Sequence, residues 1–245
     1  STTNGLCLGL EKVADKSNEI KAIPKLIKRL DVAGQIIMTD AMGCQKDIAK
    51  TIRDEKADYI LALKLNHKNL YDDVVHAFKN EDFLHNASKH EVWRDGHGRT
   101  EHQIFIVISD LDWLESRKDW QDLQAIILVE SERIIGDKTS QEKRYYLSSL
   151  KENAEDIGGH IRDYWGIENK YHWVLDVIFK EDQRILWNKN FARNEALIRR
   201  IGFNLLKQFQ ALELEKTGKK IALKSLRKVF MHNFGYCCFS DAFIL

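Results

Sequence analysis

Two short apolar runs near the start of the chain constrain its fold most. Residues 35–40 and 59–64 are each too short for a helix, and each is followed by a segment with helical spacing of apolar residues, at about 44–55 and 68–78. Strands that are apolar on both faces are typical of a sheet covered by helices, with largely parallel strands. The first 80 residues therefore predict an α/β layer.

Two further elements are expected before these runs. Residues 6–13 alternate between apolar and other side chains as a strand does, and residues 23–30 have helical spacing. Pro24, the only proline, would lie in the first turn of that helix, where proline is tolerated.

The pattern changes further along the chain. Between about residues 80 and 150 three β runs follow one another, at 102–109, 123–135 and 144–149, with charged or glycine-containing turns between or before them. After residue 151 helical spacing continues nearly to the end. A chain of 245 residues lies near the upper size for a single core, so one large domain with an insertion and two smaller domains both remain open.

Composition excludes several classes of protein. The hydrophobic content of 44% is too high for a disordered chain, and no apolar run approaches the roughly 18 residues of a membrane span. We therefore expect a soluble globular protein with no membrane partner.

The net charge of +1 averages unlike parts, because residues 183–230 hold 12 Lys and Arg against 3 Asp and Glu. Near neutrality is thus no argument against nucleic-acid binding.

The four cysteines indicate a reducing compartment. They lack Cys-x-x-Cys spacing and the density of a disulfide scaffold, so we expect a cytoplasmic location. The adjacent Cys237 and Cys238 fit packing in an apolar tail better than a redox site.

Asp40 is the first candidate for chemistry. It stands at the carboxyl end of a buried apolar run and is followed by the small residues Ala41 and Gly43. Open α/β sheets place ligands and metals at this point. The alternative, equally open from the residues alone, is that Asp40 caps the helix that starts near Cys44 or Gln45.

The second candidate lies late in the chain. On a helix, Glu168, His172 and Asp176 recur at intervals of four and share one face, where carboxylates and an imidazole can bind or orient a metal. A solvated face with ordinary side-chain pairing fits the same spacing, and so does a zinc site. For a hard divalent cation, the oxygens of Asp40 and Glu168 matter most.

If these carboxylates converge in space, they suggest metal-assisted phosphoryl transfer. Two Mg²⁺ ions about 4 Å apart can activate the attacking oxygen and stabilise the leaving one. The sequence has no P-loop, Gly-x-Gly-x-x-Gly motif or serine nucleophile elbow that would indicate another chemistry.

At these residues the chain resembles the insertion-sequence transposases of the DDE class, in particular the group of H-repeat-associated proteins. The resemblance covers nearly the whole chain. Its matching segments are 15–20 (DKSNEI), 22–24 (AIP), 39–46 (TDAMGCQK), 96–99 (GHGR), 144–149 (RYYLSS), 161–169 (IRDYWGIEN) and 172–177 (HWVLDV).

The resemblance implies a ribonuclease-H-like mixed sheet flanked by helices, with a β-rich insertion before the last catalytic helix. Residues 1–79 would form the first part of the catalytic domain, residues 80–150 the insertion, and residues 151–245 the helical completion with basic C-terminal helices. Asp40 resembles the second Asp of the catalytic triad and Glu168 its Glu, which together bind Mg²⁺ or Mn²⁺.

Five further residues are candidates for DNA contact or for orienting the acidic residues. Three match family positions beside the catalytic Glu, and two belong to the basic C-terminal segment. They are Arg162, His172, Asp176, Arg199 and Arg200.

The sequence also departs from the family. The first Asp of the family stands in an Asp-Gly-Lys segment upstream of the region that matches Ser1, and this sequence has no such segment. Residues 64–67 (KLNH) replace a Lys-Gly-Asn-Gln motif, and residues 186–189 (LWNK) replace a basic stretch. We therefore expect an N-terminally incomplete chain with impaired catalysis.

The predicted function is metal-dependent DNA cleavage and strand transfer at insertion-sequence ends. The expected partners are double-stranded transposon-end DNA and further copies of the chain on that DNA, at the nucleoid. One alternative is a non-catalytic, DNA-binding remnant of a transposase, based on the basic C-terminal segment. Another is an unrelated zinc hydrolase that uses His172 and Glu168.

Overall fold

A computed structural model describes the chain except for residues 3, 12–18, 97, 168–170, 180–188 and 234–245. Six strands form one sheet in the order β1-β2-β6-β5-β4-β3. The strands are β1 (Ile36–Thr39), β2 (Asp58–Leu63), β3 (Ser88–Gly96), β4 (Arg99–Ile108), β5 (Ala125–Ile135) and β6 (Lys138–Ser148). The α-helices are α1 (Glu19–Ile27), α2 (Lys46–Asp54), α3 (Lys68–Ala77), α4 (Glu81–Leu84), α5 (Ala154–Ile167), α6 (Lys189–Thr217) and α7 (Leu223–Asn233).

The sheet is mixed and mainly antiparallel. Only β1 and β2 run parallel, whereas β2 pairs with β6 in antiparallel register and the strands from β6 to β3 continue so. The expectation of a largely parallel sheet therefore holds only for the first two strands. Parallel neighbours need a crossover connection, and among strands that are neighbours both in sequence and in the sheet only β1 and β2 are joined by an α-helix. The antiparallel neighbours β5 and β6 are joined by a tight turn at Gly136, where φ is +56°.

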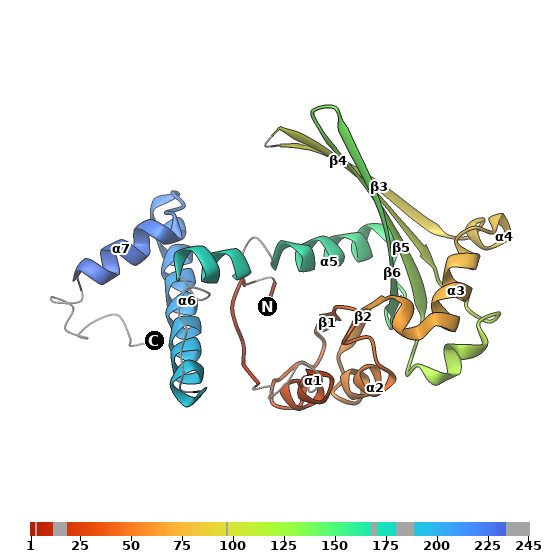
Figure 1. The fold of residues 1–245 in the computed structure, drawn as a ribbon, viewed down its shortest axis with the longest axis horizontal. Helices are drawn as coiled ribbons and strands as arrows, with labels where there is room; N and C mark the ends of the chain where they lie inside the picture. The colour runs from red at the N-terminus through yellow and green to blue at the C-terminus, as the bar shows by residue number, and fades with distance from the viewer. Residues whose placement is uncertain (3, 12–18, 97, 168–170, 180–188, 234–245) are drawn as a thin grey trace. The chain divides into compact units, whose positions relative to one another are not determined.

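One face of the sheet carries the larger core. Side chains of α1, α2 and α3 pack on it together with the loop that contains the buried Trp120, on the side of the sheet opposite α5 in Figure 1. The strand side chains that point into this core are Tyr59, Leu61, Leu63, Ile108, Ile126, Leu128, Tyr145 and Leu147. Their alternation along each strand reproduces the two-residue period of a pleated sheet.

The opposite face is covered by α5. Phe105 of β4 is fully buried on this face, and the carbon that a side chain at Gly158 would add lies only 3.0 Å from its ring. Arg162, one turn further along α5, places its guanidinium 5.7 Å from the centre of the same ring. Gly158 thus lets the helix approach the sheet closely.

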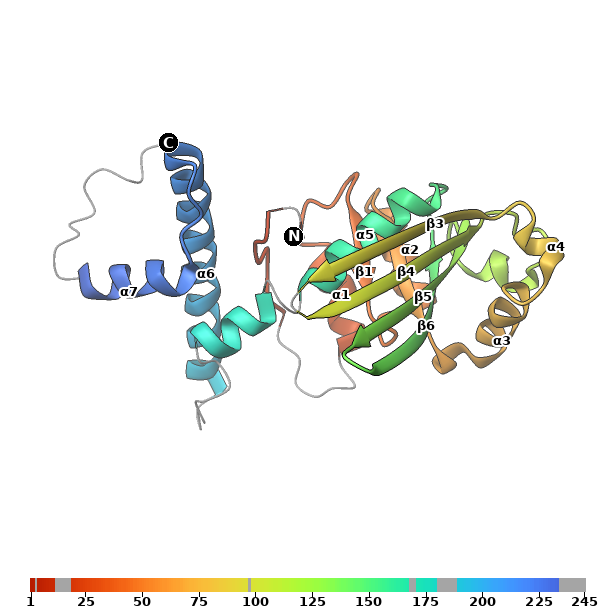
Figure 2. The ribbon, with the colours of Figure 1, turned by 90° about the horizontal axis from the view of Figure 1, so that it is seen from above.

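Strand β3 was not predicted from the sequence. It alternates between half-buried and exposed side chains up to Trp93 and is exposed beyond it, so it lacks the apolar run that marks β2 or β5. Its place comes from nine paired residues with β4, from Ser88 opposite Val107 to Gly96 opposite Arg99. Figure 2 shows β3 to β6 side by side.

The described residues divide into two compact units, and each is considered by itself. The sheet unit is Glu11–Tyr164, and the helical unit combines Ser1–Leu10 with Trp165–Leu245. The predicted division at residues 79 and 150 stays a prediction.

The strand expected at residues 6–13 is wrong where it can be judged, because residues 6–11 form no regular element. Within the helical unit, the side chain of Asn204 in α6 accepts a hydrogen bond from the backbone N–H of Cys7 (2.9 Å) and donates one to its carbonyl (2.8 Å). The N-terminal segment thus satisfies its backbone against a helix instead of a strand.

The helix expected at 23–30 begins earlier, at Glu19, and ends at Ile27. Pro24 therefore lies in its second turn instead of its first. No helix in the described part of the chain is long and apolar enough to cross a bilayer.

Candidate functional site

Asp40 follows β1 directly and ends the strand with a sharp turn. Its Oδ1 accepts hydrogen bonds from the backbone N–H groups of Met42 (3.1 Å) and Gly43 (3.2 Å). Asp40 itself is exposed to solvent. The strand thus delivers a carboxylate to the surface at the carboxyl end of the parallel pair.

The alternative that Asp40 caps the next helix is wrong. Helix α2 begins at Lys46, its N-cap residue is Gln45, and no side chain makes the cap hydrogen bond. Asp40 lies five residues before this cap, and its carboxylate accepts hydrogen bonds within its own turn.

Residues 40–44, which we call the Asp40 loop, are hydrogen-bonded to the segment that follows β2. Asn66 donates from Nδ2 to the carbonyl of Ala41 (2.9 Å), and Nε2 of His67 lies 2.7 Å from the carbonyl of Cys44. The ring of His67 also meets the buried Trp120 edge-on, with 5.2 Å between ring centres. These contacts fix the loop that carries the carboxylate.

Sequence reasoning missed this role of Asn66 and His67. It noted them only as a departure from the family motif. The signal was available, since they follow the parallel neighbour of β1 and so must emerge at the same edge of the sheet.

Glycine at position 43 allows the Asp40 loop to close. A β-carbon there would lie 2.6 Å from Cβ of Thr39. Cys44, next in the chain, is completely buried, and burial raises the pKa of its thiol to about 12. The loop therefore presents Asp40 outward on a tightly packed base.

Arg162 is the other predicted site residue within the sheet unit. It is half-buried on α5, and burial together with the charge of Arg94 lowers the pKa of its guanidinium. Arg162 thus combines packing on Phe105 with a partly accessible cation.

The other predicted site residues, from position 168 onward, belong to the helical unit. Glu168 lies outside the described residues. His172 is exposed and Asp176 half-buried, and Val174–Ile178, which contains Asp176, is wound as a π-helix instead of the α-helix assumed from the spacing. The three-residue ridge therefore stays a prediction.

Arg199 and Arg200 are engaged within α6. Arg199 forms a 2.6 Å ion pair with Glu195, and only 12% of the Arg199 side chain is exposed. Arg200 donates to the carbonyl of Ala196 (3.0 Å). More accessible cations gather around the turn from α6 to α7, where the exposed residues are Lys216, Lys219, Lys220, Lys224 and Lys228.

Of the predicted metal ligands, the structure describes Asp40, and its carboxylate suits a hard divalent cation. Asp40 offers an exposed carboxylate, which is a ligand type that Mg²⁺ and Mn²⁺ prefer. Among the described residues no group of three His, Cys, Asp or Glu side chains comes together as a metal site. The zinc alternative therefore gains no support from them.

A mixed sheet with a carboxylate at the end of its parallel strand pair is consistent with a DDE transposase domain. The family described as the transposase DDE domain matches residues 1–205. The chain belongs to this family of DDE transposases.

Similar proteins show which group within this family the chain resembles. The chain is 37% identical over 214 residues to the H repeat-associated putative transposase YhhI of Escherichia coli K12, covering 84% of this chain and 56% of that protein. It is 36% identical over 232 residues to the putative transposase YncI of Escherichia coli O157:H7, covering 92% and 60%. The resemblance to the H-repeat-associated group is thus confirmed, and the chain spans less than two thirds of these relatives' length.

Proposed function

We propose that this chain is the catalytic part of a transposase that cuts DNA at insertion-sequence ends and joins it to a target with the help of divalent metal ions. The observation that carries the proposal is the exposed carboxylate of Asp40 at the end of the parallel strand pair, oriented by its own turn, while Asn66 binds the carbonyl of the next residue in that turn, Ala41. Family membership gives the reaction class.

Asp40 and Glu168 would hold the metal, which supplies Lewis-acid stabilisation of charge at the phosphate when bound. The backbone N–H groups of Met42 and Gly43 keep Oδ1 of Asp40 oriented. Oδ2, which accepts neither of these hydrogen bonds, would be the oxygen that coordinates the metal. Copies of the chain would act together on double-stranded DNA.

The 245 residues contain two of the three acidic positions that the family resemblance implies. We therefore expect this chain by itself to cleave DNA poorly, because loss of one ligand weakens electrostatic stabilisation of the transition state.

A metal-mapping experiment tests the proposal without depending on cleavage activity. Fe²⁺ with ascorbate and peroxide cuts the protein backbone beside a bound metal, and excess Mg²⁺ should compete. We expect cuts near Asp40 and Glu168 that Asp40→Asn and Glu168→Gln abolish.

Asp54→Asn is the matched control, since Asp54 is an exposed carboxylate of α2 paired with Lys50. Cuts that persist near Asp40 in Asp40→Asn would refute its role as a ligand. A wild-type chain without any local cuts would refute the metal site.

A DNA-binding remnant is the second candidate. The five exposed lysines around the α6–α7 turn support it, because such a cluster can track phosphates without any metal. Salt-sensitive DNA binding together with no metal-directed cuts would favour this candidate.

A further inference from the structure

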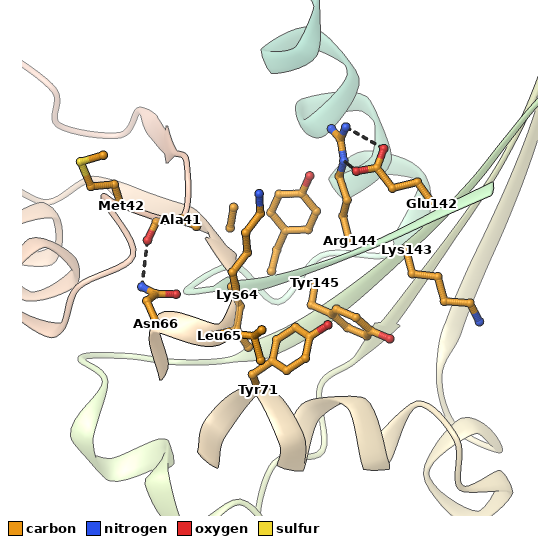
Figure 3. A pocket seen from close by; sticks show the side chains of 13 residues that line it. Ala41, Met42, Lys64, Leu65, Asn66, Tyr71, Glu142, Lys143, Arg144 and Tyr145 are labelled. Atoms are coloured by element: carbon orange, nitrogen blue, oxygen red, sulfur yellow. Dashed lines mark hydrogen bonds and ion pairs between the residues drawn. The ribbon is translucent and has the colours of Figure 1, made fainter. Parts of the chain in front are cut away.

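A pocket of about 510 Å³ opens beside the Asp40 loop, within the sheet unit. Ala41 and Met42 of that loop form one wall, and residues from the end of β2, from α3 and from β6 complete it (Figure 3). Tyr71, Tyr145, Tyr146 and Leu65 make much of the lining apolar or aromatic. Such a lining suits sugar and base, so the question is what its charged groups bind.

Three cations line this pocket: Lys64, at the end of β2, and Lys143 and Arg144 of β6. Lys143 forms an ion pair with Glu130, so the other two are the candidates for binding an anion. The last paired residues of β2 and β6 are Leu63 and Tyr145, so Lys64 and Arg144 face each other one step further along the antiparallel pair. Figure 3 shows both side chains pointing to the same side. Like charges directly opposite each other on a sheet are unfavourable unless an anion lies with them.

In the protein without DNA, the anion beside these cations is the carboxylate of Glu142. Nε and Nη2 of Arg144 each donate to one carboxylate oxygen of Glu142, both at 2.8 Å. Hydrogen bonding to Arg144, aided by the charges of Arg144 and Lys64, lowers the pKa of Glu142. This two-pronged geometry is the one in which arginine also binds a phosphate.

We propose that Lys64 and Arg144 bind a backbone phosphate of DNA beside the Asp40 loop. In the protein without DNA, the Glu142 carboxylate occupies the position on Arg144 that this phosphate would take. The inference rests on the proposed function, because it assigns a substrate contact of the same site. DNA must displace the Glu142 carboxylate from Arg144, and this exchange is inexpensive since 57% of the Glu142 side chain and 42% of the Arg144 side chain are exposed.

Equilibrium binding of the full 245-residue chain to a labelled DNA duplex tests the inference, with Kd measured between about 50 and 300 mM NaCl. Lys64→Gln and Arg144→Gln should each weaken binding about fivefold or more and reduce the salt slope by about one, as expected for one lost phosphate contact.

Glu142→Gln should instead tighten binding about threefold or more, because a neutral amide competes weakly for Arg144. Glu132→Gln is the matched control: Glu132 lies on β5 outside the pocket, where it accepts a hydrogen bond from Gln141. It reports the general effect of removing one negative charge.

A double variant isolates the mechanism. If Glu142 acts by occupying Arg144, the gain from Glu142→Gln should disappear in the Arg144→Gln background, whereas independent effects would add. Equal gains in Glu142→Gln and Glu132→Gln, or unchanged affinity in both cation variants of a folded protein, would overturn the phosphate site while leaving the proposed function standing. A wild-type chain that does not bind DNA would overturn both.

Discussion

At the residue scale, the site depends on how residues 39–44 pack. Asp40 is exposed, whereas Gly43 and Cys44 beside it are buried, so one short loop joins a reactive surface to a rigid base. The sequence indicated Asp40 by its place after an apolar run. It did not indicate that Gly43 is needed for contact with Thr39, because that contact depends on the shape of the turn.

Replacing Gly43 by alanine should therefore damage the site without touching the carboxylate. The new β-carbon would lie 2.6 Å from Cβ of Thr39, so the loop must shift, at a cost of about 1–3 kcal/mol in unfolding free energy. Denaturant unfolding measures the loss, and metal mapping should show weaker cuts near Asp40. Wild-type stability and mapping in Gly43→Ala would contradict the packing argument.

Cys44 should be inert in the native protein. With a pKa of about 12, roughly one thiol in ten thousand is ionised at pH 8, and burial also blocks the reagent. Peptide mass spectrometry after iodoacetamide treatment should find Cys44 unmodified in the native state and modified in denaturant. The partly exposed Cys7 gives an internal comparison. Native alkylation of Cys44 as fast as that of Cys7 would refute this expectation.

At the element scale, α5 depends on the sheet more than on its own sequence. It contains the adjacent glycines 158 and 159, which lower intrinsic helix stability, yet it buries Ala154, Ile157, Gly158 and Ile161 as it packs on one face of the sheet. Helical spacing after residue 151 predicted this helix. Its depth of contact with Phe105 could not be predicted, because that depends on a strand some fifty residues earlier in the chain.

The two glycines provide a matched pair. Gly159→Ala should stabilise the protein by about 0.5–1 kcal/mol, since its β-carbon meets nothing within 4 Å and alanine favours the helix. Gly158→Ala meets the buried ring of Phe105 at 3.0 Å and should be at least about 1 kcal/mol less stable than Gly159→Ala. Thermal and urea unfolding give the comparison, and equal stability of the two variants would show that α5 is not tightly packed there.

At the scale of the whole molecule, charge is distributed unevenly over a nearly neutral chain. The basic count in residues 183–230 was visible in the sequence, but the choice of Arg199 and Arg200 as DNA contacts was not informed by their surroundings. The structure shows Arg199 covered by Glu195, while lysines at the α6–α7 turn are exposed. These lysines are now the better candidates for phosphate contact.

Reversing two of these charges tests that choice. Lys219→Glu with Lys220→Glu should weaken duplex DNA binding at least about tenfold at moderate salt and lower the salt slope by about two. Lys21→Glu with Lys25→Glu changes the net charge equally on α1 and should affect the slope much less. Equal losses in both pairs would mean that only net charge matters.

The sequence by itself determined the local elements and the family. Apolar periodicity located β1, β2, β4, β5 and most helices, and short motifs around Asp40 and Glu168 identified the DDE transposases, because both signals lie within a few neighbouring residues. Only the tertiary structure decided that β3 joins the sheet, that the N-terminal segment lies along α6, and that Lys64, Arg144 and Glu142 line one pocket beside the Asp40 loop. These features arise from contacts between distant parts of the chain, which periodicity along the sequence does not encode.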